Sequence, residues 1–169
     1  MKEDTKRLAT LAMIVAMASA VHYLEGLLPP ILPAVPGTKL GLANIVTVFA
    51  LYELGAAPAL VILLARCLLG GLFAGNVSAL LFSLLGGFTA MAVMIGLKRC
   101  RRLSIYGVSI GGAAAHNCGQ IAAACLTLGS MAPLYYLPIL LGASLITGAV
   151  TGVAAACLFR ALVHTNILR

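Results

Sequence analysis

Polar side chains with strong hydrogen-bonding capacity interrupt the most apolar parts of this sequence. The stretch HNCGQ places His116, Asn117 and Gln120 within an alanine- and glycine-rich segment, and Arg66 lies in the apolar stretch LLARCLLGG. A spacing of four residues puts His116 and Gln120 on one face of a helix. Groups of this kind can bind a small ligand, or they can join neighbouring helices through hydrogen bonds.

The residues needed for catalysis or for metal binding are not arranged in a pattern typical of an enzyme. The acidic residues are Glu3, Asp4, Glu25 and Glu53, so the sequence has no aspartate pair to hold magnesium and a diphosphate. It also has no nucleotide-binding glycine loop with a lysine and no nucleophile elbow. The five cysteines lack metal-binding spacing. We therefore expect a protein that is not an enzyme and that binds no metal or cofactor.

The composition is typical of an integral membrane protein. Of the 169 residues, 62% are hydrophobic and 9% are charged, whereas soluble domains carry about 25% charged residues. Such a chain has too little polar surface to cover a water-soluble globule. The N-terminal region resembles a signal peptide at Ala18-Ser19-Ala20, but cleavage there would remove a helix that the predicted topology needs.

Six apolar segments predict six membrane-spanning helices, since about 20 apolar residues cross a bilayer. We expect a single all-α transmembrane domain over residues 1–169. A proline-rich stretch, PPILPAVPGTK, follows the first segment and cannot form a regular helix. The predicted helices lie at about residues 8–28, 40–54, 57–72, 76–97, 104–128 and 134–163.

The basic residues predict how this bundle is oriented. Nine of the eleven lysines and arginines lie at the ends of apolar segments, in three places: Lys2, Lys6 and Arg7; Lys98, Arg99, Arg101 and Arg102; Arg160 and Arg169. With six spans, all three places fall on one side, which the positive-inside rule assigns to the cytoplasm. We expect both termini there, in a bacterial plasma membrane. The net charge of +7 then reflects topology rather than nucleic-acid binding.

This topology places most of the polar residues at one depth, in the outer half of the membrane, at a helical rise of about 1.5 Å per residue. This zone has a net positive charge, because it holds Lys39 and Arg66 but only one acidic residue, Glu25. A net positive charge favours an anionic ligand. Arg66 could instead pair with Glu25 or Glu53. The predicted ligand site consists of Glu25, Lys39, Asn44, Arg66, Asn76, His116, Asn117 and Gln120.

Small residues recur at a spacing of four on two of the predicted helices. The first carries Ala12, Ala16 and Ala20, and the sixth carries Gly148 and Gly152. Such stripes let helix backbones approach each other closely in lipid. Alanine-rich helices also produce them by chance, so both interpretations stay open for the first helix.

Four stretches of the sequence together resemble one known family. They are PGTKLGLANI at 36–45, LLARCLLGGLFAGN at 63–76, SLLGG at 83–87 and YGVSIGGAAAHNCGQ at 106–120. They resemble the heptaprenyl diphosphate synthase component I family, also called the Gx transporter family. The resemblance covers nearly the whole chain, and the motifs occur in family order.

That family is in turn similar to the substrate-binding S components of energy-coupling factor transporters, which are six-helix bundles with both termini inside. The resemblance implies that Ala12, Ala16 and Ala20 dock onto a coupling subunit driven by two ATPases. It also implies an outward-facing ligand site beneath the loop after the first helix. The implied ligand residues are Lys39, Asn44, Arg66, Asn76, His116, Asn117 and Gln120.

Two functions of different classes follow. The first is a substrate-binding membrane subunit of an importer for a small vitamin- or cofactor-like ligand, with an anionic one favoured. The second is a non-catalytic membrane partner of a soluble prenyl diphosphate synthase, in an isoprenoid–quinone or flavin redox pathway. The basic loop at 98–102 could meet an acidic partner or anionic lipid in that role.

Overall fold

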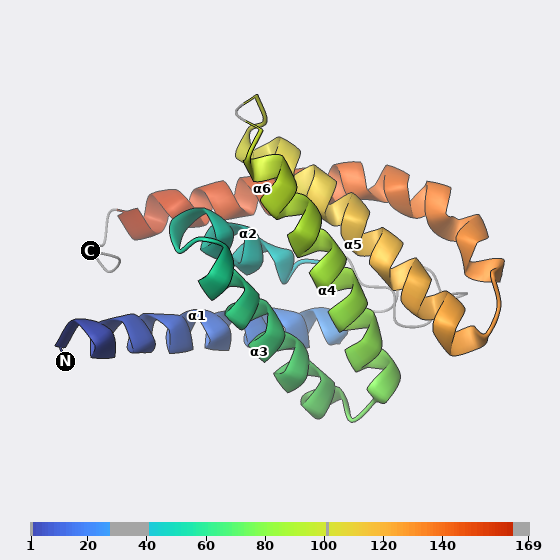
Figure 1. Ribbon diagram of the computed structural model, residues 1–169, viewed down its shortest axis with the longest axis horizontal. Helices are drawn as coiled ribbons and strands as arrows, with labels where there is room; N and C mark the ends of the chain where they lie inside the picture. The colour runs from blue at the N-terminus through green and yellow to red at the C-terminus, as the bar shows by residue number, and fades with distance from the viewer. Residues whose placement is uncertain (1, 28–40, 101, 164–169) are drawn as a thin grey trace.

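The computed structural model describes residues 2–27, 41–100 and 102–163, which form six α-helices and one short 3-10 helix (Figure 1). Each predicted helix overlaps an observed one, so the all-α prediction is confirmed. The first helix begins earlier than expected, and the 3-10 helix precedes the last one. The elements are α1 Lys2–Gly26, α2 Asn44–Glu53, α3 Ala56–Ala74, α4 Val77–Lys98, α5 Ile105–Leu128, η1 Ala132–Tyr136 and α6 Leu137–Val163.

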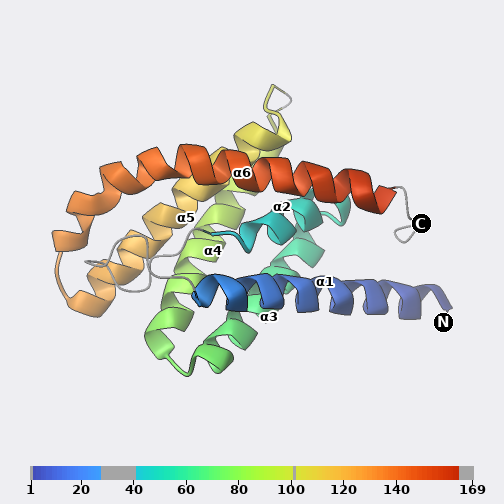
Figure 2. The ribbon, with the colours of Figure 1, turned by 180° about the vertical axis from the view of Figure 1, so that it is seen from behind.

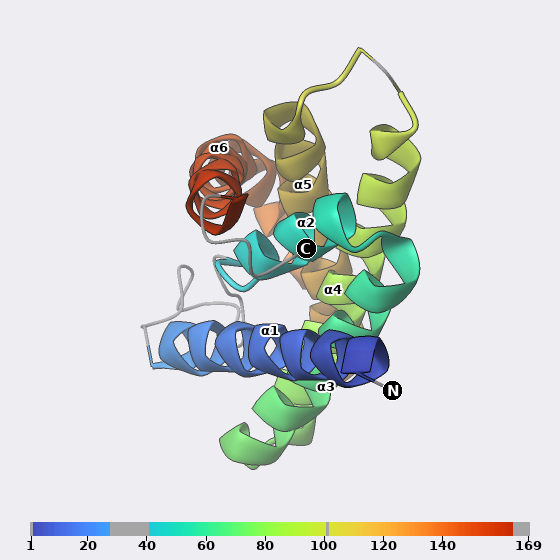
Figure 3. The ribbon, with the colours of Figure 1, turned by 90° about the vertical axis from the view of Figure 1, so that its left-hand side faces the viewer.

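Each long helix packs mainly against the next long helix along the chain. α1 packs against α3, α3 against α4, α4 against α5, and α5 against α6. The short helix α2 contacts α1, α3, α4 and α6, and it lies between α1 and α6 in Figures 2 and 3. The N-terminal end of α1 and the C-terminal end of α6 lie at the same end of the molecule (Figures 1 and 2).

Helix α2 forms the centre of the bundle. Its 10 residues are buried on nearly all sides, as expected for a helix that lacks a polar face. Phe49 packs edge-on against Phe159 of α6, with the ring centroids 5.4 Å apart. At about 1.5 Å per residue, α2 is about half as long as the roughly 30 Å hydrocarbon core of a bilayer.

Charged side chains from two other helices satisfy the ends of α2. The carboxylate of Glu25 in α1 accepts hydrogen bonds from the backbone N–H groups of residues 41–43, just before α2 begins. At the other end, Lys98 Nζ of α4 donates to the Leu51 carbonyl oxygen at 2.7 Å and lies 4.9 Å from the Tyr52 ring centroid. Anions are favourable at helix N-termini and cations at C-termini. Both contacts therefore stabilise α2 in its buried position.

Glycine residues allow α5 and α6 to approach each other closely. A Cβ atom added to Gly148 would lie 2.5 Å from the Cα of Ile110, a backbone atom that cannot easily move. One turn further along α6, a Cβ at Gly152 would lie 3.2 Å from the Cβ of Ser109. The hydroxyls of Ser109 and Thr151 form a 2.7 Å hydrogen bond between the two helices. The close packing predicted from the glycine spacing is confirmed.

The alanine stripe of α1 faces away from the bundle. Ala12, Ala16 and Ala20 are exposed, whereas Ile14 and Ala18 on the opposite side of the helix are buried. Among the described residues, the stripe therefore does not pack helices together. It leaves a flat face that is open to lipid or to another protein, and its docking role stays a prediction.

Four helical segments are long and apolar enough to cross a membrane: Leu8–Gly26, Ala56–Ala74, Val77–Lys98 and Ala132–Arg160. The chain is therefore a multi-pass membrane protein. The prediction of six spans is thus supported for four segments, while α2, Asn44–Glu53, is an apolar helix shorter than these, and the six-span topology stays a prediction. Helix α5 has 24 residues, but its polar residues His116, Asn117 and Gln120 lower its mean hydropathy.

Candidate functional site

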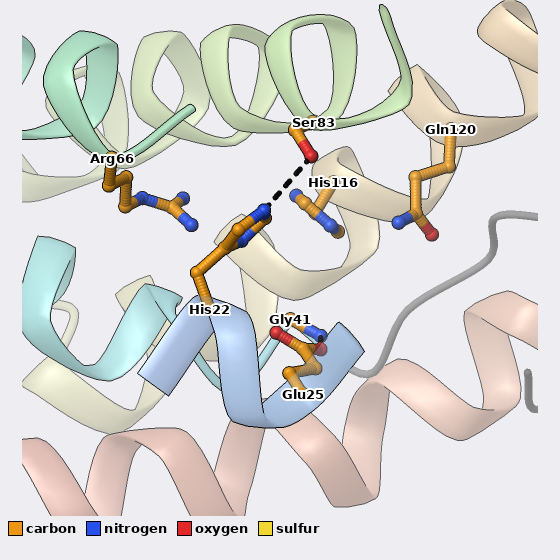
Figure 4. A pocket seen from close by; sticks show the side chains of 7 residues that line it. All are labelled: His22, Glu25, Gly41, Arg66, Ser83, His116 and Gln120. Carbon is orange, nitrogen blue, oxygen red and sulfur yellow. Dashed lines mark hydrogen bonds between the residues drawn. The ribbon is translucent and has the colours of Figure 1, made fainter. Parts of the chain in front are cut away.

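A small polar cavity lies where α1, α3, α4 and α5 meet the turn before α2 (Figure 4). Its volume is about 10 Å³, which is room for about one water molecule. Most of its lining residues can form hydrogen bonds, although the helices that supply them are strongly apolar. They are His22, Glu25, Gly41, Arg66, Ser83, His116 and Gln120.

Arg66 supplies the positive charge in this cavity. Its side chain is 2% exposed, and Figure 4 shows the guanidinium directed toward the other labelled side chains. One Nη atom donates a 3.1 Å hydrogen bond to Oδ1 of Asn44, a neutral partner. The Nε atom is buried and has no hydrogen-bond partner among the described residues. Burying a guanidinium with one N–H group unpaired costs free energy. Arg66 is therefore the residue of the site that most needs a functional explanation.

Glu25 lines the same cavity, but its carboxylate binds the backbone. It accepts from the N–H of Leu42 at 3.1 Å, from that of Ala43 at 3.4 Å and from that of Gly41. Within the described ranges, no salt bridge joins it to Arg66, whose hydrogen bond goes to Asn44. Glu25 therefore holds the start of α2 rather than neutralising the guanidinium by direct contact.

Two imidazole rings reach the cavity because glycines make room for them. His22 and His116 are 4% and 5% exposed, and His22 Nε2 lies 3.4 Å from the Ser83 hydroxyl. A Cβ atom at Gly70 of α3 would overlap the His22 ring. A Cβ at Gly86 of α4 would lie 2.8 Å from Cε1 of His116. The positions of both rings therefore depend on glycine in the adjacent helix.

The structure brings half of the predicted ligand residues together. Those that line the cavity are Glu25, Arg66, His116 and Gln120. Asn44 does not line it, but it holds the Arg66 side chain through the hydrogen bond between them. The i, i+4 spacing explains why His116 and Gln120 face the same space.

The other predicted residues lie elsewhere. Asn117 follows His116 in α5 but does not line the cavity. Its Nδ2 donates to the Leu140 carbonyl oxygen of α6 at 2.8 Å. This is the helix-joining role that the sequence left as an alternative. Asn76 is exposed and caps α4, accepting a 2.9 Å hydrogen bond from the N–H of Ser78. Lys39 lies outside the described residues.

Three lining residues were not among the predicted ligand residues: His22, Gly41 and Ser83. The signal for His22 was its place three residues before Glu25, which puts both on one helix face. Ser83 carried no such signal, because one serine in an apolar helix is unremarkable. Gly41 enters the wall because Glu25 holds its backbone.

Comparison with known proteins gives one finding. A family model described as heptaprenyl diphosphate synthase component I matches residues 14–158. This range runs from α1 into α6 and contains all seven residues that line the cavity. No curated protein and no solved structure matches the chain.

Proposed function

This chain belongs to the heptaprenyl diphosphate synthase component I family, and we propose that it is the substrate-binding membrane subunit of an energy-coupling-factor-type importer. It would capture a small vitamin- or cofactor-like ligand with an anionic group from outside the cell. The observation that carries the proposal is the buried polar cavity around Arg66 in a multi-pass membrane protein. Ionisable residues at membrane depth are costly and by default mark a ligand or ion site.

The wall of the cavity supports ligand binding over simple helix association. Arg66, His22 and His116 come from three helices and meet beside a space of about 10 Å³. Side chains that serve only to join helices need no space between them. The cavity is far smaller than the roughly 300 Å³ of small ligand pockets. We propose that the described state is a closed one, which must open for a whole ligand.

The exposed face of α1 supports docking onto a partner. Ala12, Ala16 and Ala20 present a flat surface that no other helix in the described part of the chain covers. In a bilayer, small residues let a second helix approach within backbone contact. We propose that this face binds a coupling subunit that works with ATPases, and that movement of the whole bundle releases the ligand inside.

We further propose that the chain itself performs no prenyl transfer. Asp4 is the only aspartate in the sequence, and it lies outside the apolar segments. The carboxylate of Glu25 accepts hydrogen bonds from the backbone N–H groups of residues 41–43. Neither arrangement offers the paired carboxylates that hold magnesium and a diphosphate.

The docking role can be tested by replacing Ala16 with tryptophan. Ala16 is exposed, so the indole ring would project outward and leave the chain's own core intact. We expect co-purification with the coupling subunit and its ATPases to fall to background. The control is Leu145→Trp on α6, a residue 60% exposed, which should leave the complex unchanged. A complex that survives Ala16→Trp would exclude α1 as the docking face.

A second function is favoured by the family description itself, which names a component of a prenyl diphosphate synthase. The chain would then be a non-catalytic membrane partner of a soluble synthase. The loop after α4 offers exposed Arg99 and Arg102 to an acidic partner. Deletion should then abolish long-chain prenyl diphosphate synthesis until the membrane protein is restored. Normal synthesis in the deletion strain would remove this alternative.

A further inference from the structure

We propose that the cavity binds a carboxylate group of the ligand, with the guanidinium of Arg66 as its counter-ion. This inference rests on the proposed role as a ligand-binding subunit and names the chemical class of the ligand. It begins from a buried charge that Glu25, in the same cavity wall, offsets only through space and without an ion pair among the described residues. Arg66 is 2% exposed and always charged, and its hydrogen bond to Asn44 brings no negative charge.

The one acidic residue in the cavity wall does not meet this need directly. Both oxygens of Glu25 accept from the backbone N–H groups of residues 41–43. Moving the carboxylate to Arg66 would leave those buried amides unsatisfied, which is itself costly. The Nε–H of Arg66 therefore lacks an acceptor among the described residues. An anion that enters from outside the chain would supply one.

Shape favours a carboxylate over a phosphate. A guanidinium binds a carboxylate through two parallel hydrogen bonds, one of which can come from Nε. The space is about 10 Å³, which is close to the size of one oxygen-centred group. A planar carboxylate can enter edge-on with small shifts of the wall. A tetrahedral phosphate has three terminal oxygens that do not lie in one plane, so it would need larger shifts of the wall than a carboxylate.

The remaining wall can complete the binding of the carboxylate. The Ser83 hydroxyl and the Gln120 amide can both donate, and each imidazole of His22 and His116 carries at least one N–H. These side chains lie around the cavity from α1, α4 and α5 (Figure 4). The body of the ligand would stay outside the cavity, and only its acidic end would reach Arg66.

The test uses the full chain in lipid nanodiscs and follows its thermal unfolding by far-ultraviolet circular dichroism. The probes are sodium formate and sodium acetate, with sodium chloride and inorganic phosphate at equal ionic strength. A ligand that binds the folded state raises the unfolding midpoint in a saturable way. We expect formate and acetate to do so, and chloride and phosphate not to. Equal shifts for all four salts, or a shift with phosphate alone, would overturn the inference.

Variants of Arg66 separate ligand binding from a structural role. The double variant Arg66→Met with Asn44→Leu removes the cation together with its neutral partner. We expect its midpoint without added anion to equal or exceed that of the unchanged protein, because an undercompensated buried charge is lost. Its formate shift should disappear. A lower midpoint with the formate shift intact would show that Arg66 is structural and would contradict the proposal.

Two single variants complete the design. Arg66→Lys keeps the charge but loses the planar fork, and it should weaken formate binding by about tenfold or more. Arg160→Met, at an exposed position of α6, should leave the formate shift unchanged. If the formate shift holds while docking onto a coupling subunit fails, the importer role is wrong and the carboxylate site stands. If docking holds and the formate shift is absent, only this inference is wrong.

Discussion

Glu25 and Arg66 line the same cavity, yet their side chains bind different partners. Opposite charges at similar depth suggest an ion pair, and the sequence left that pairing open. The structure instead joins Glu25 to the backbone of residues 41–43 and Arg66 to Asn44. One charged residue therefore stabilises the start of α2, while the other binds a neutral side chain.

The capping role of Glu25 predicts a loss of stability in Glu25→Gln. Glutamine keeps one acceptor oxygen but lacks the negative charge that favours backbone N–H groups at a helix start. We expect the free energy of unfolding to fall by about 1–2 kcal/mol, measured by titration with sodium dodecyl sulfate. The control is Glu53→Gln at the C-terminal end of α2, where removing an anion should cost nothing. Equal losses in both variants would show that the cap does not matter.

Some of the site could be predicted from residue spacing. His116 and Gln120 were found because a helix repeats its faces every three to four residues. Asn117, their neighbour in sequence, faces α6 instead and bonds to Leu140. Ser83 was missed because its role comes from its position opposite His22. Sequence spacing describes one helix at a time, whereas a site between helices depends on how each helix is rotated.

Among the elements, α5 is the one whose two neighbours constrain it most closely. Gly119 lies against the backbone of α4 at Leu85. On its other side, Ile110 lies against Gly148 of α6. Both contacts bring helix backbones together, and between them they fix the rotation that turns His116 and Gln120 toward the cavity. Packing on two faces of α5 thus determines the geometry of the site.

This close packing predicts a destabilising effect of Gly148→Ala. The added methyl group would lie 2.5 Å from the Cα of Ile110, so α5 and α6 must separate. We expect the free energy of unfolding to fall by about 1–3 kcal/mol, measured by the same detergent titration. Gly142→Ala on the same helix is the matched control, since nothing lies within 4 Å of its added Cβ. A similar result for both would show that the contact contributes little.

Helix boundaries were predictable to within a few residues in most cases, because apolar length and turn residues determine them. The burial of α2 was not predictable. A helix of 10 residues without a polar face gives no sequence signal of which neighbours surround it. Its N-terminal partner, Glu25, lies 16 residues before Gly41, beyond the range of any local pattern. Contacts over that distance follow from tertiary packing alone.

At the scale of the whole molecule, the N-terminal end of α1 and the C-terminal end of α6 lie at one end of the bundle (Figures 1 and 2). The positive-inside rule predicts that the basic residues near Lys6, Lys98 and Arg160 all lie on the cytoplasmic side, and this orientation stays a prediction. Length and composition identify four helices that could span a membrane. Helix α5 is less apolar because it carries His116, Asn117 and Gln120.

This orientation predicts where cysteine residues can be labelled. Cys100 is exposed at the end of α4, beside the basic loop. In a variant that keeps Cys100 as its only cysteine, a membrane-impermeant maleimide should label inside-out vesicles but not intact cells. The control adds Ser130→Cys to a cysteine-free chain, at an exposed position after α5, and should show the reverse. Labelling of Cys100 in intact cells would contradict cytoplasmic termini.

The short, capped helix α2 also has a consequence for how the protein is made. Long apolar helices can leave the translocon one by one, because each is stable in lipid alone. Helix α2 has 10 residues, and its preceding amides depend on the carboxylate of Glu25, so we expect α2 not to be stable in lipid alone. Glu25 is synthesised before α2 and Lys98 after it, so we expect α2 to reach its buried position only once α4 has been made. We expect α2 to enter the membrane together with the helices that surround it. The cavity is complete only after α5 has been made, because His116 and Gln120 form part of its wall.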